Sequence, residues 1–500
     1  MKNDVQKLRC SSQHAVKKSV YKLLFLAALG ISLFQGCITV GPDYVPPEPK
    51  VPDVWHQALT EGLTEGEASI QTWWTSFNDP MLNSLIERSS AGNLDLKEAV
   101  ARIKEILARR GIATGERFPD INADGTAKRA RTSEDFFPPG VDAKGTDYYY
   151  RMGLGASWEM DFWGRIRRLV ESASADLEAS YEGYRDVQVL LYAEIALNYV
   201  EVRTLQARIR FAENNVETQR DTLKITKARV KAEIAPDLDV HQAELNLAIT
   251  ESIIPTLRSS MTRAINRLGV LLGELPSTLH DELTKEIPIP QPQDEIIVSL
   301  PANLMRQRPD IRQAERELAA QTARIGVATS ELYPRFFLLG DFGFEGLSDI
   351  FDYKKRAWSF GPTFRWNIFD GGRVRNFIRV EDARTEQALV RYEQTVLEAM
   401  EDVENSLVAY AEESSRREIL EGSVVAAQKS VELVKVLYIT GLTDFQNVLD
   451  MERSLFEQQD GFAASEGSVT QNLIRVYRSL GGGWEIENDP SAEKQSKEGK

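Results

Sequence analysis

Side chains that commonly carry out catalysis or hold metals are few and scattered in this sequence. The 500 residues include four histidines and two cysteines, too few for a multi-histidine metal site, a zinc cluster or a disulfide framework. Asp341-Phe342-Gly343 matches a kinase metal motif, but it falls in a strand-like stretch without the companion motifs. Gly481-Gly482-Gly483 is not followed by the helix of a nucleotide-binding loop. We therefore expect no enzyme, no metal site and no cofactor.

One cysteine, Cys37, lies where a covalent modification is expected. Residues 1–36 open with a basic stretch, and Leu23–Phe34 is an apolar run of 12 residues. That is the layout of a secretory signal, and the run is too short to cross a membrane. Cys37 follows Gly36, which resembles the lipobox of bacterial lipoproteins. We expect a signal peptide over 1–36 and lipidation at Cys37; the alternative is a plain signal peptide with an incidental cysteine.

Charge and hydropathy exclude two large classes of protein. The formal net charge is −15, which argues against nucleic acid as a partner because phosphate binding needs a basic surface. Residues 1–36 carry six basic residues and one acidic residue, so removing them leaves a mature chain near −20. Beyond residue 36 there is no run of 18 apolar residues, which excludes a polytopic helical membrane protein.

Two stretches, 148–162 and 358–368, alternate between apolar residues and small or polar ones. Strict alternation is typical of a strand with one apolar and one polar face. A weaker strand pattern precedes each, at 120–131 and 335–346, so we expect hairpins over 120–162 and 335–369. The alternative is an amphipathic sheet whose apolar face packs on a protein core.

A membrane position is favoured for these four strands. Strands of about 10 residues cross a bilayer when tilted, and the apolar faces end in aromatic residues such as Trp158 and Phe162. The opposite face would then line a water-filled lumen. Its charged residues are expected to be Arg151, Glu159, Asp161, Asp341 and Arg365.

The rest of the chain is predicted to be helical. Residues 165–235 contain one glycine and no proline, and apolar residues recur there every three or four positions from Leu191 to Val230, a coiled-coil seam. After a break at Pro236-Asp237 a return helix runs toward Gly269. A second long helix is expected over 373–440, with a return helix ending near Leu480. Shorter helices, 80–113 and 301–332, precede the hairpins.

The sequence repeats itself. Asn93–Ala99 aligns with Arg308–Ala314 at an offset of 215, and Gly164-Arg165 aligns with Gly372-Arg373 at an offset of 208. The expected organisation is a signal peptide (1–36), a lipid-anchored extended segment (37–77), a first repeat (78–273), a Pro-rich linker (274–300), a second repeat (301–483) and a polar disordered tail (484–500).

These elements constrain the assembly. Four strands cannot close a barrel, and open sheet edges are not tolerated in lipid. Three copies would pool twelve strands, an even number within the bacterial range. We therefore expect a mainly α fold with a small β part: a trimeric, twelve-stranded transmembrane β-barrel continued by a long periplasmic coiled-coil barrel.

Several motifs resemble the outer-membrane factor family of TolC- and OprM-like efflux ducts, and most closely its lipoprotein, NodT-type branch. They are Val40–Tyr44, Arg308–Leu318, Ile325–Ala328, Leu332–Pro334 and Phe369–Arg373. The resemblance covers residues 37–483. It implies a homotrimeric duct in the outer membrane, docked to a periplasmic adaptor (a membrane fusion protein) and an inner-membrane pump of the resistance-nodulation-division type, through which drugs or other small toxic compounds leave unchanged.

The resemblance also implies a closed gate at the periplasmic turns of the paired coils. Matching positions in the second repeat are Tyr438, Asp444, Asn447 and Asp450, and Asp237 and Asp239 occupy the equivalent turn of the first. Carboxylates repeated by symmetry at a constriction would attract cations and obstruct anions. The alternative is that they are ordinary solvated turn residues and helix caps.

Two other functions remain open. The same fold could serve type I protein secretion, which lipidation at Cys37 disfavours. A non-conducting periplasmic coiled-coil scaffold or adaptor is also possible, although an adaptor would need a lipoyl-like domain between its coils, and none is visible.

Overall fold

The computed structural model describes residues 39–48, 51–52, 54–56, 63–65, 70–131, 146–292, 296–298, 301–346 and 352–484. The expected signal peptide, Cys37, the tips of both hairpins and the tail beyond Trp484 lie outside these residues. The described elements, in chain order, are β1 (Leu63–Glu65), η1 (Trp73–Phe77), α2 (Pro80–Gly92), α3 (Leu94–Gly115), β2 (Asp120–Arg131), β3 (Thr146–Met160), α4 (Arg165–Lys231), α5 (Asp237–Leu271), α6 (His280–Leu283), β4 (Ile296–Val298), α7 (Pro301–Gln307), α8 (Pro309–Ser330), β5 (Arg335–Gly346), η3 (Tyr353–Lys355), β6 (Arg356–Arg365), α9 (Arg373–Thr440) and α10 (Phe445–Ser479).

The same order of elements occurs twice. The series α2-α3-β2-β3-α4-α5 is followed by α7-α8-β5-β6-α9-α10. The chain divides into two compact units: one comprises Met1–Pro46, Glu105–Glu178 and Arg316–Val390, and the other Pro47–Lys104, Ala179–Glu315 and Arg391–Lys500.

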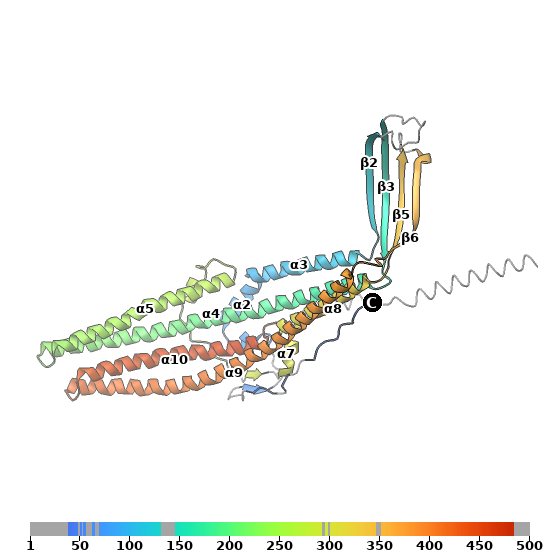
Figure 1. Cartoon of the computed structure of the whole chain (residues 1–500). Helices are drawn as coiled ribbons and strands as arrows, with labels where there is room; N and C mark the ends of the chain where they lie inside the picture. The colour runs from blue at the N-terminus through green and yellow to red at the C-terminus, as the bar shows by residue number, and fades with distance from the viewer. Residues whose placement is uncertain are drawn as a thin grey trace, which may run out of the picture. The chain divides into compact units, whose positions relative to one another are not determined.

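The first unit contains a four-stranded antiparallel sheet with strand order β2-β3-β5-β6 (Figure 1). Its central contact joins the two hairpins, because β3 pairs with β5 from Tyr150↔Gly346 to Met160↔Phe336. The four strands predicted from alternation are therefore present, and the third and fourth begin and end within three residues of the expected positions.

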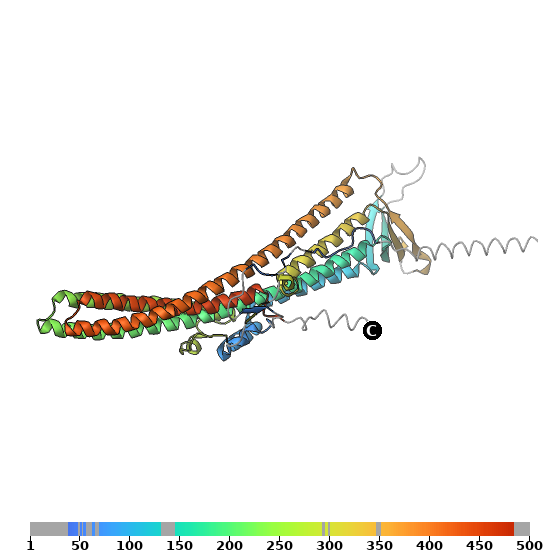
Figure 2. The ribbon, with the colours of Figure 1, turned by 90° about the horizontal axis from the view of Figure 1, so that it is seen from below.

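The second unit contains two antiparallel helix pairs, which form two coiled coils. In Figures 1 and 2 α4 runs beside α5 and α9 runs beside α10, and a polar contact such as Arg220 Nη2 to Glu251 Oε1 (2.6 Å) joins one pair. The apolar seam predicted along α4 is buried from Leu191 to Val216, with Ile195, Val202 and Ala212 fully enclosed, and half-buried at Leu223 and Val230. No helix among the described residues combines the length and the hydropathy needed to cross a membrane.

Two expectations about the shorter helices are corrected. Residues 80–113 form two helices interrupted at Asn93, and 301–332 form two helices interrupted at Arg308. The Asn93 side chain accepts from Leu96 N (2.9 Å) and donates to Leu271 O (2.8 Å), so it caps one helix and ties the joint to α5. At the matching joint Pro309 disfavours helical geometry at the residue before it and lacks an N–H.

The segment expected as a Pro-rich linker has structure of its own. Within 274–300 the chain forms α6, and β4 pairs in parallel with β1, which comes from the expected extended segment 37–77. Leu279, Leu283 and Ile289 are buried in the main core of the second unit. The segment therefore packs against the helices rather than only joining the two repeats.

Candidate functional site

The strand register gives the sheet two chemically different faces. Odd-numbered residues of β2 and even-numbered residues of β3, β5 and β6 share one face, because Leu154 pairs with both Ala123 and Phe342. The larger apolar side chains on this face are Ile121, Tyr148, Tyr150, Met152, Leu154, Trp158, Met160, Phe336, Leu338, Phe342, Phe344, Trp358, Phe360 and Phe364; Arg129, Arg131 and Arg356 share it near the hairpin loops. Several are strongly exposed: Trp358 and Phe360 each have 71% of their surface accessible. A contiguous exposed apolar face of this kind needs a lipid or protein partner.

The opposite face carries a row of paired charges across three strands. Arg151 of β3 lies 3.2 Å from Asp341 of β5 and 3.6 Å from Asp124 of β2. The Tyr149 hydroxyl donates to Glu345 at 3.2 Å on the same face. The side chains of Arg151, Asp124 and Asp341 are 40–49% exposed, so they remain in contact with water while they pair with one another.

The remaining predicted lumen residues lie at the end of the sheet next to the helices. Glu159 accepts from Arg165 at 2.8 Å and also from Arg335. Arg365 is the last residue of β6 and is in register with Arg335. Phe337 and Leu339 also lie on this face, so the charged row is not continuous along β5.

Asp161 differs from the expectation. It lies one residue beyond β3, and its carboxylate accepts from Ile166 N (3.1 Å) and Arg167 N (3.0 Å) at the start of α4. Asp370 does the same for α9 through Gly372 N and Val374 N, both at 2.8 Å. Both carboxylates therefore act as helix caps at the sheet-to-helix junction.

Aromatic rings gather at the same junction. Trp163 stacks on Tyr333 with centroids 4.7 Å apart, and Phe162 meets Phe336 edge-on at 5.1 Å. The indole N–H of Trp163 donates to Pro334 O at 2.9 Å. Amphipathic aromatic rings of this kind are typical of the level where lipid meets water.

The turns between the paired helices bring Tyr438 and Asp239 together, two of the predicted gate residues. Tyr438 is 5% exposed and its hydroxyl donates to Asp239 Oδ2 at 3.3 Å. Its ring packs on Phe445 with centroids 5.2 Å apart. Burial raises the pKa of the Tyr438 hydroxyl, so it remains a donor at neutral pH.

Arg229, which we did not predict, completes this contact. Its guanidinium lies 4.6 Å from the centre of the Tyr438 ring and donates to Ile439 O at 2.8 Å. No arginine stands between Tyr438 and Asp450 in the sequence. The structure supplies the arginine from α4 instead, and proximity to α4 in space has no signal in the local sequence.

The Asp239 carboxylate is held in a balance of opposing effects. Burial raises the pKa of Asp239, and the charge of Asp444 raises it further, whereas Tyr438 and Arg229 oppose the rise. The net result is a pKa above the ordinary value, so ionised Asp239 is disfavoured relative to a solvated aspartate.

The other four predicted gate residues are exposed. Asp444 occupies the N-cap position of α10 without making a capping bond, and Asp237 opens α5. Asn447 donates to Thr443 Oγ1 at 2.8 Å, and Asp450 accepts from Gln446 at 3.0 Å, both within one turn of helix. None of the four is hydrogen-bonded to Tyr438 in the part of the chain that the structure describes, although the charge of Asp444 acts on Asp239.

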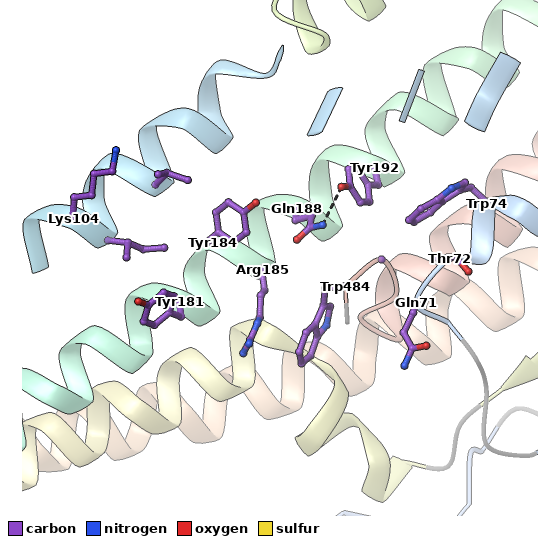
Figure 3. Close-up of a pocket in the computed structure, with 13 residues that line it drawn as sticks. Gln71, Thr72, Trp74, Lys104, Tyr181, Tyr184, Arg185, Gln188, Tyr192 and Trp484 are labelled. Carbon is purple, nitrogen blue, oxygen red and sulfur yellow. Dashed lines mark hydrogen bonds between the residues drawn. The ribbon is translucent and has the colours of Figure 1, made fainter. Parts of the chain in front are cut away.

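A cavity of about 660 Å³ in the second unit has five aromatic side chains among the 13 residues that line it (Figure 3). Its lining residues include Trp74, Tyr181, Tyr184, Tyr192 and Trp484, with Lys104 and Arg185 as the charged groups. The ring centre of Trp484 lies 4.7 Å from the guanidinium of Arg185 and 5.2 Å from that of Arg312, and its indole N–H donates to Gln307 O at 3.0 Å. The aromatic wall therefore anchors the chain just beyond α10.

The glycines before Trp484 allow that anchoring. Gly481 and Gly483 have φ of +79° and +115°, and Gly483 N donates to Ile70 O at 3.0 Å. A Cβ on Gly482 would lie 2.8 Å from Ile70 O. Gly481–Gly483 therefore allow the backbone to approach Ile70 closely.

Among the described residues no group of three or more acidic, histidine or cysteine side chains could hold a metal.

Comparison with known proteins agrees with this geometry. The family model for outer membrane efflux proteins matches residues 85–274 and 300–482. Nodulation protein T of Rhizobium leguminosarum bv. trifolii is 32% identical over 455 residues, covering 90% of this chain and 94% of that protein. The toluene efflux pump outer membrane protein TtgI of Pseudomonas putida is 28% identical over 477 residues, covering 93% of this chain and 99% of that protein.

A solved structure is similar over the same extent. The outer-membrane channel OprN superposes with a TM-score of 0.81 at 36% identity, covering 89% of this chain and 99% of that one. The family and this solved relative are channels rather than enzymes. The family that the sequence motifs indicated is thus confirmed. The chain belongs to the outer membrane efflux protein family, and it is a protein of the outer membrane.

Proposed function

We propose that this protein is the outer-membrane exit duct of a tripartite efflux system, passively conducting drugs or other small toxic compounds out of the periplasm. The observation that carries the proposal is the two-faced sheet: one face exposes large apolar side chains and the other holds paired charges. A sheet with lipid on one side and water on the other is the wall of a pore.

The sheet also supports a homotrimer. Among the described residues β2 and β6 each pair along one edge only. Free edges cannot stand in lipid, so the edge strands of neighbouring copies pair, and three copies close a barrel of about twelve strands. Arg151, Glu159, Asp341 and Arg365 then face its lumen.

The helices of the second unit support the same assembly. Exposed aliphatic residues follow α9 at Leu397, Ile419, Val425, Leu433 and Val436. A second set follows α5 at Leu238, Leu245 and Ile249. We expect the α9 set of one copy to pack against the α5 set of the next copy, which is a head-to-tail contact. Three such contacts close a ring, and the coils of the three copies then form an α-helical barrel.

The partners follow from the relatives. TtgI is named as the outer membrane protein of a toluene efflux pump, and OprN is named as an outer-membrane channel. By similarity, this protein docks onto a periplasmic adaptor and an inner-membrane pump, of the resistance-nodulation-division type. A lipid on Cys37 anchors the mature N-terminus in the outer membrane, and the two repeats descend from one duplicated unit.

The periplasmic gate is assigned to the turns of the coils. In a symmetric trimer, Asp444 and Asp450 each recur three times around the axis; Asn447 lies between them in α10, and Asp237 lies at the α4–α5 turn. Carboxylates that are exposed in one chain are available to form such rings, which attract cations and obstruct anions. Contacts of Tyr438 with Asp239 and Arg229 hold the two turns of each chain together.

Conductance tests the proposal directly. Purified protein in a planar lipid bilayer should show small, mostly closed channels, and Asp444→Asn or Asp450→Asn should lengthen the open time. A trimer that conducts with none of these variants would contradict the duct and favour the scaffold. Deletion of the gene should raise susceptibility to small toxic compounds. Unchanged susceptibility together with loss of a secreted polypeptide would favour type I protein secretion.

A further inference from the structure

A buried carboxylate, Glu452, lies two helical turns beyond the α9–α10 turn. Glu452 is 2% exposed, and its neighbours Val448 and Leu449 belong to an apolar cluster, an unfavourable environment for a carboxylate. Taking a carboxylate out of water is costly unless charged and hydrogen-bonding partners replace the water. The contacts of this side chain therefore show what holds it there.

Each of the three other long helices supplies one partner. Thr222 of α4 donates from Oγ1 to Glu452 Oε1 at 2.6 Å, and Lys435 Nζ of α9 lies 3.0 Å from the same oxygen. Asn246 of α5 donates from Nδ2 to Glu452 Oε2 at 3.5 Å. The side-chain oxygen Oδ1 of Asn246 accepts from Arg453 Nε at 3.1 Å, which turns the side-chain NH₂ of Asn246 toward Glu452.

Tyr438 is likewise buried and contacts all three other long helices, but two ion pairs of the same coils are different. Arg208 and Asp460 are also paired across the coils, but their side chains are 28% and 25% exposed, so water competes for both. Arg220–Glu251 joins α4 to α5 within one coil and is more exposed still. Glu452 combines burial with contacts to both helices of the opposite coil and to its own partner helix.

We propose that Glu452 is a positioning residue that latches the α4–α5 coil to the α9–α10 coil and so holds the periplasmic turns in the arrangement seen here. The proposal rests on the proposed function, since the gate is assigned to these turns. Moving the coils apart breaks the Thr222 and Asn246 contacts and leaves Glu452 and Lys435 to be solvated again. A buried polar contact of this kind specifies one packing of helices over its alternatives.

The test compares four variants in purified full-length protein. Glu452→Gln keeps the size of the side chain but removes its charge, and Lys435→Gln removes the opposite charge. The double variant Glu452→Lys/Lys435→Glu reverses the pair, and Glu457→Ala, an exposed glutamate on the same helix, is the matched control. Trimer content and helical circular dichroism establish that each variant folds.

Two measurements are made on each variant. Hydrogen exchange of peptides from 222–246 and 434–453 reports separation of the coils without reference to transport. Single-channel recording reports open time. We expect both single variants to raise exchange in these peptides and to increase open time by about tenfold, equivalent to about 1.4 kcal/mol. The control should match the wild type, and the reversed pair should restore much of the closed time.

The outcomes separate the latch from the duct. Exchange and open time at wild-type values in both single variants would overturn the latch, even if Asp444→Asn opens the channel. Raised exchange in the control as well as in the single variants would also overturn it, since the effect would not be specific to Glu452. If no variant conducts, the duct is wrong, and the exchange data still decide whether Glu452 holds the coils together.

Discussion

Asp186 offers a sharp test of the electrostatics of the helix joint at Arg308. Its carboxylate lies beside a cavity of about 230 Å³ that is also lined by Arg308, Asp310 and Asp402. Arg308 donates to both oxygens of Asp310 at 3.1 and 2.6 Å and to Ser479 O at 2.8 Å, so its N–H groups are committed elsewhere. Burial, reinforced by the charge of Asp310 and opposed by Arg308, raises the pKa of Asp186 from 3.8 to about 6.

The sign of the stability effect follows from that direction. Because the pKa is higher in the folded state, folded Asp186 holds its proton more tightly than unfolded Asp186 does. The folded protein loses stability as the pH rises from about 4 to 6, and above 6 the loss is constant. This rise in the pKa of Asp186 from 3.8 to about 6 corresponds to about 3 kcal/mol at pH 8, and to only about 0.6 kcal/mol at pH 4.

Replacing Asp186 by Asn should therefore stabilise the protein at pH 8 and leave it almost unchanged at pH 4. An unfolding entropy of about 2.1 cal/mol/K per residue gives about 1 kcal/mol/K for a chain of this length. The expected rise in Tm is about 3 °C at pH 8 and less than about 1 °C at pH 4. The expected rise in Tm is the gain in free energy divided by the unfolding entropy. It does not depend on the oligomeric state, because both the number of Asp186 side chains and the number of residues rise in proportion to the number of copies.

The assay is thermal unfolding followed by circular dichroism at one scan rate, with wild type and variant measured in the same detergent. Asp382→Asn, which removes an exposed carboxylate from α9, controls for the change in net charge. A Tm that is unchanged at pH 8, or that falls there, would refute the reasoning. It would mean that attraction to Arg308 outweighs burial and keeps Asp186 ionised.

Three further substitutions test other contacts. Gly41→Ala should release residues 39–44 to limited proteolysis, because Gly41 has φ of +88° and a Cβ there would lie 2.4 Å from Gly326 Cα. Asn93→Ala should destabilise the protein by about 1–3 kcal/mol in thermal unfolding, because Leu96 N and Leu271 O lose their partner. Trp484→Ala should lower the free energy of unfolding by about 3–5 kcal/mol, measured in the same way, because it removes a large buried ring beyond α10 and leaves a cavity.

Each of these substitutions has a control. Gly422→Ala adds a Cβ where no atom lies within 4 Å, so its proteolysis pattern should match the wild type. Asn93→Asp keeps the acceptor for Leu96 N and should recover part of the lost stability. Trp484→Phe keeps most of the ring and should cost less than Trp484→Ala. Equal effects of a substitution and its control would show that the named contact is not the cause.

Local periodicity was enough to predict most of the elements. The long helix predicted at 373–440 has the bounds of α9, and the strand predicted at 335–346 has those of β5. The faces of the strands also follow from the sequence, because a strand alternates its side chains regardless of what surrounds it. The register then confirms which side chains share the apolar face, including Leu154 and Phe342.

Interruptions within elements were harder to predict. The break at Asn93 depends on a hydrogen bond to Leu271 O, 178 positions away in the sequence. Asp161 continues the alternation of β3 by sequence, yet its carboxylate binds the first N–H groups of α4. At Asn93 a backbone group far along the chain decided the role of the polar side chain, whereas at Asp161 the first N–H groups of the following helix did so.

By itself, the sequence determined the class of elements, their order, the two-faced strands and the family, because each of these is written in short-range spacing and local motifs. Only the tertiary structure decided which side chains meet across the coils. Arg229 contacts Tyr438 from 209 positions away, Glu452 is buried among three other helices, and Asp186 faces Arg308. The physical reason is that solvation and pairing of a charge depend on neighbours in space, and packing of distant helices determines those neighbours.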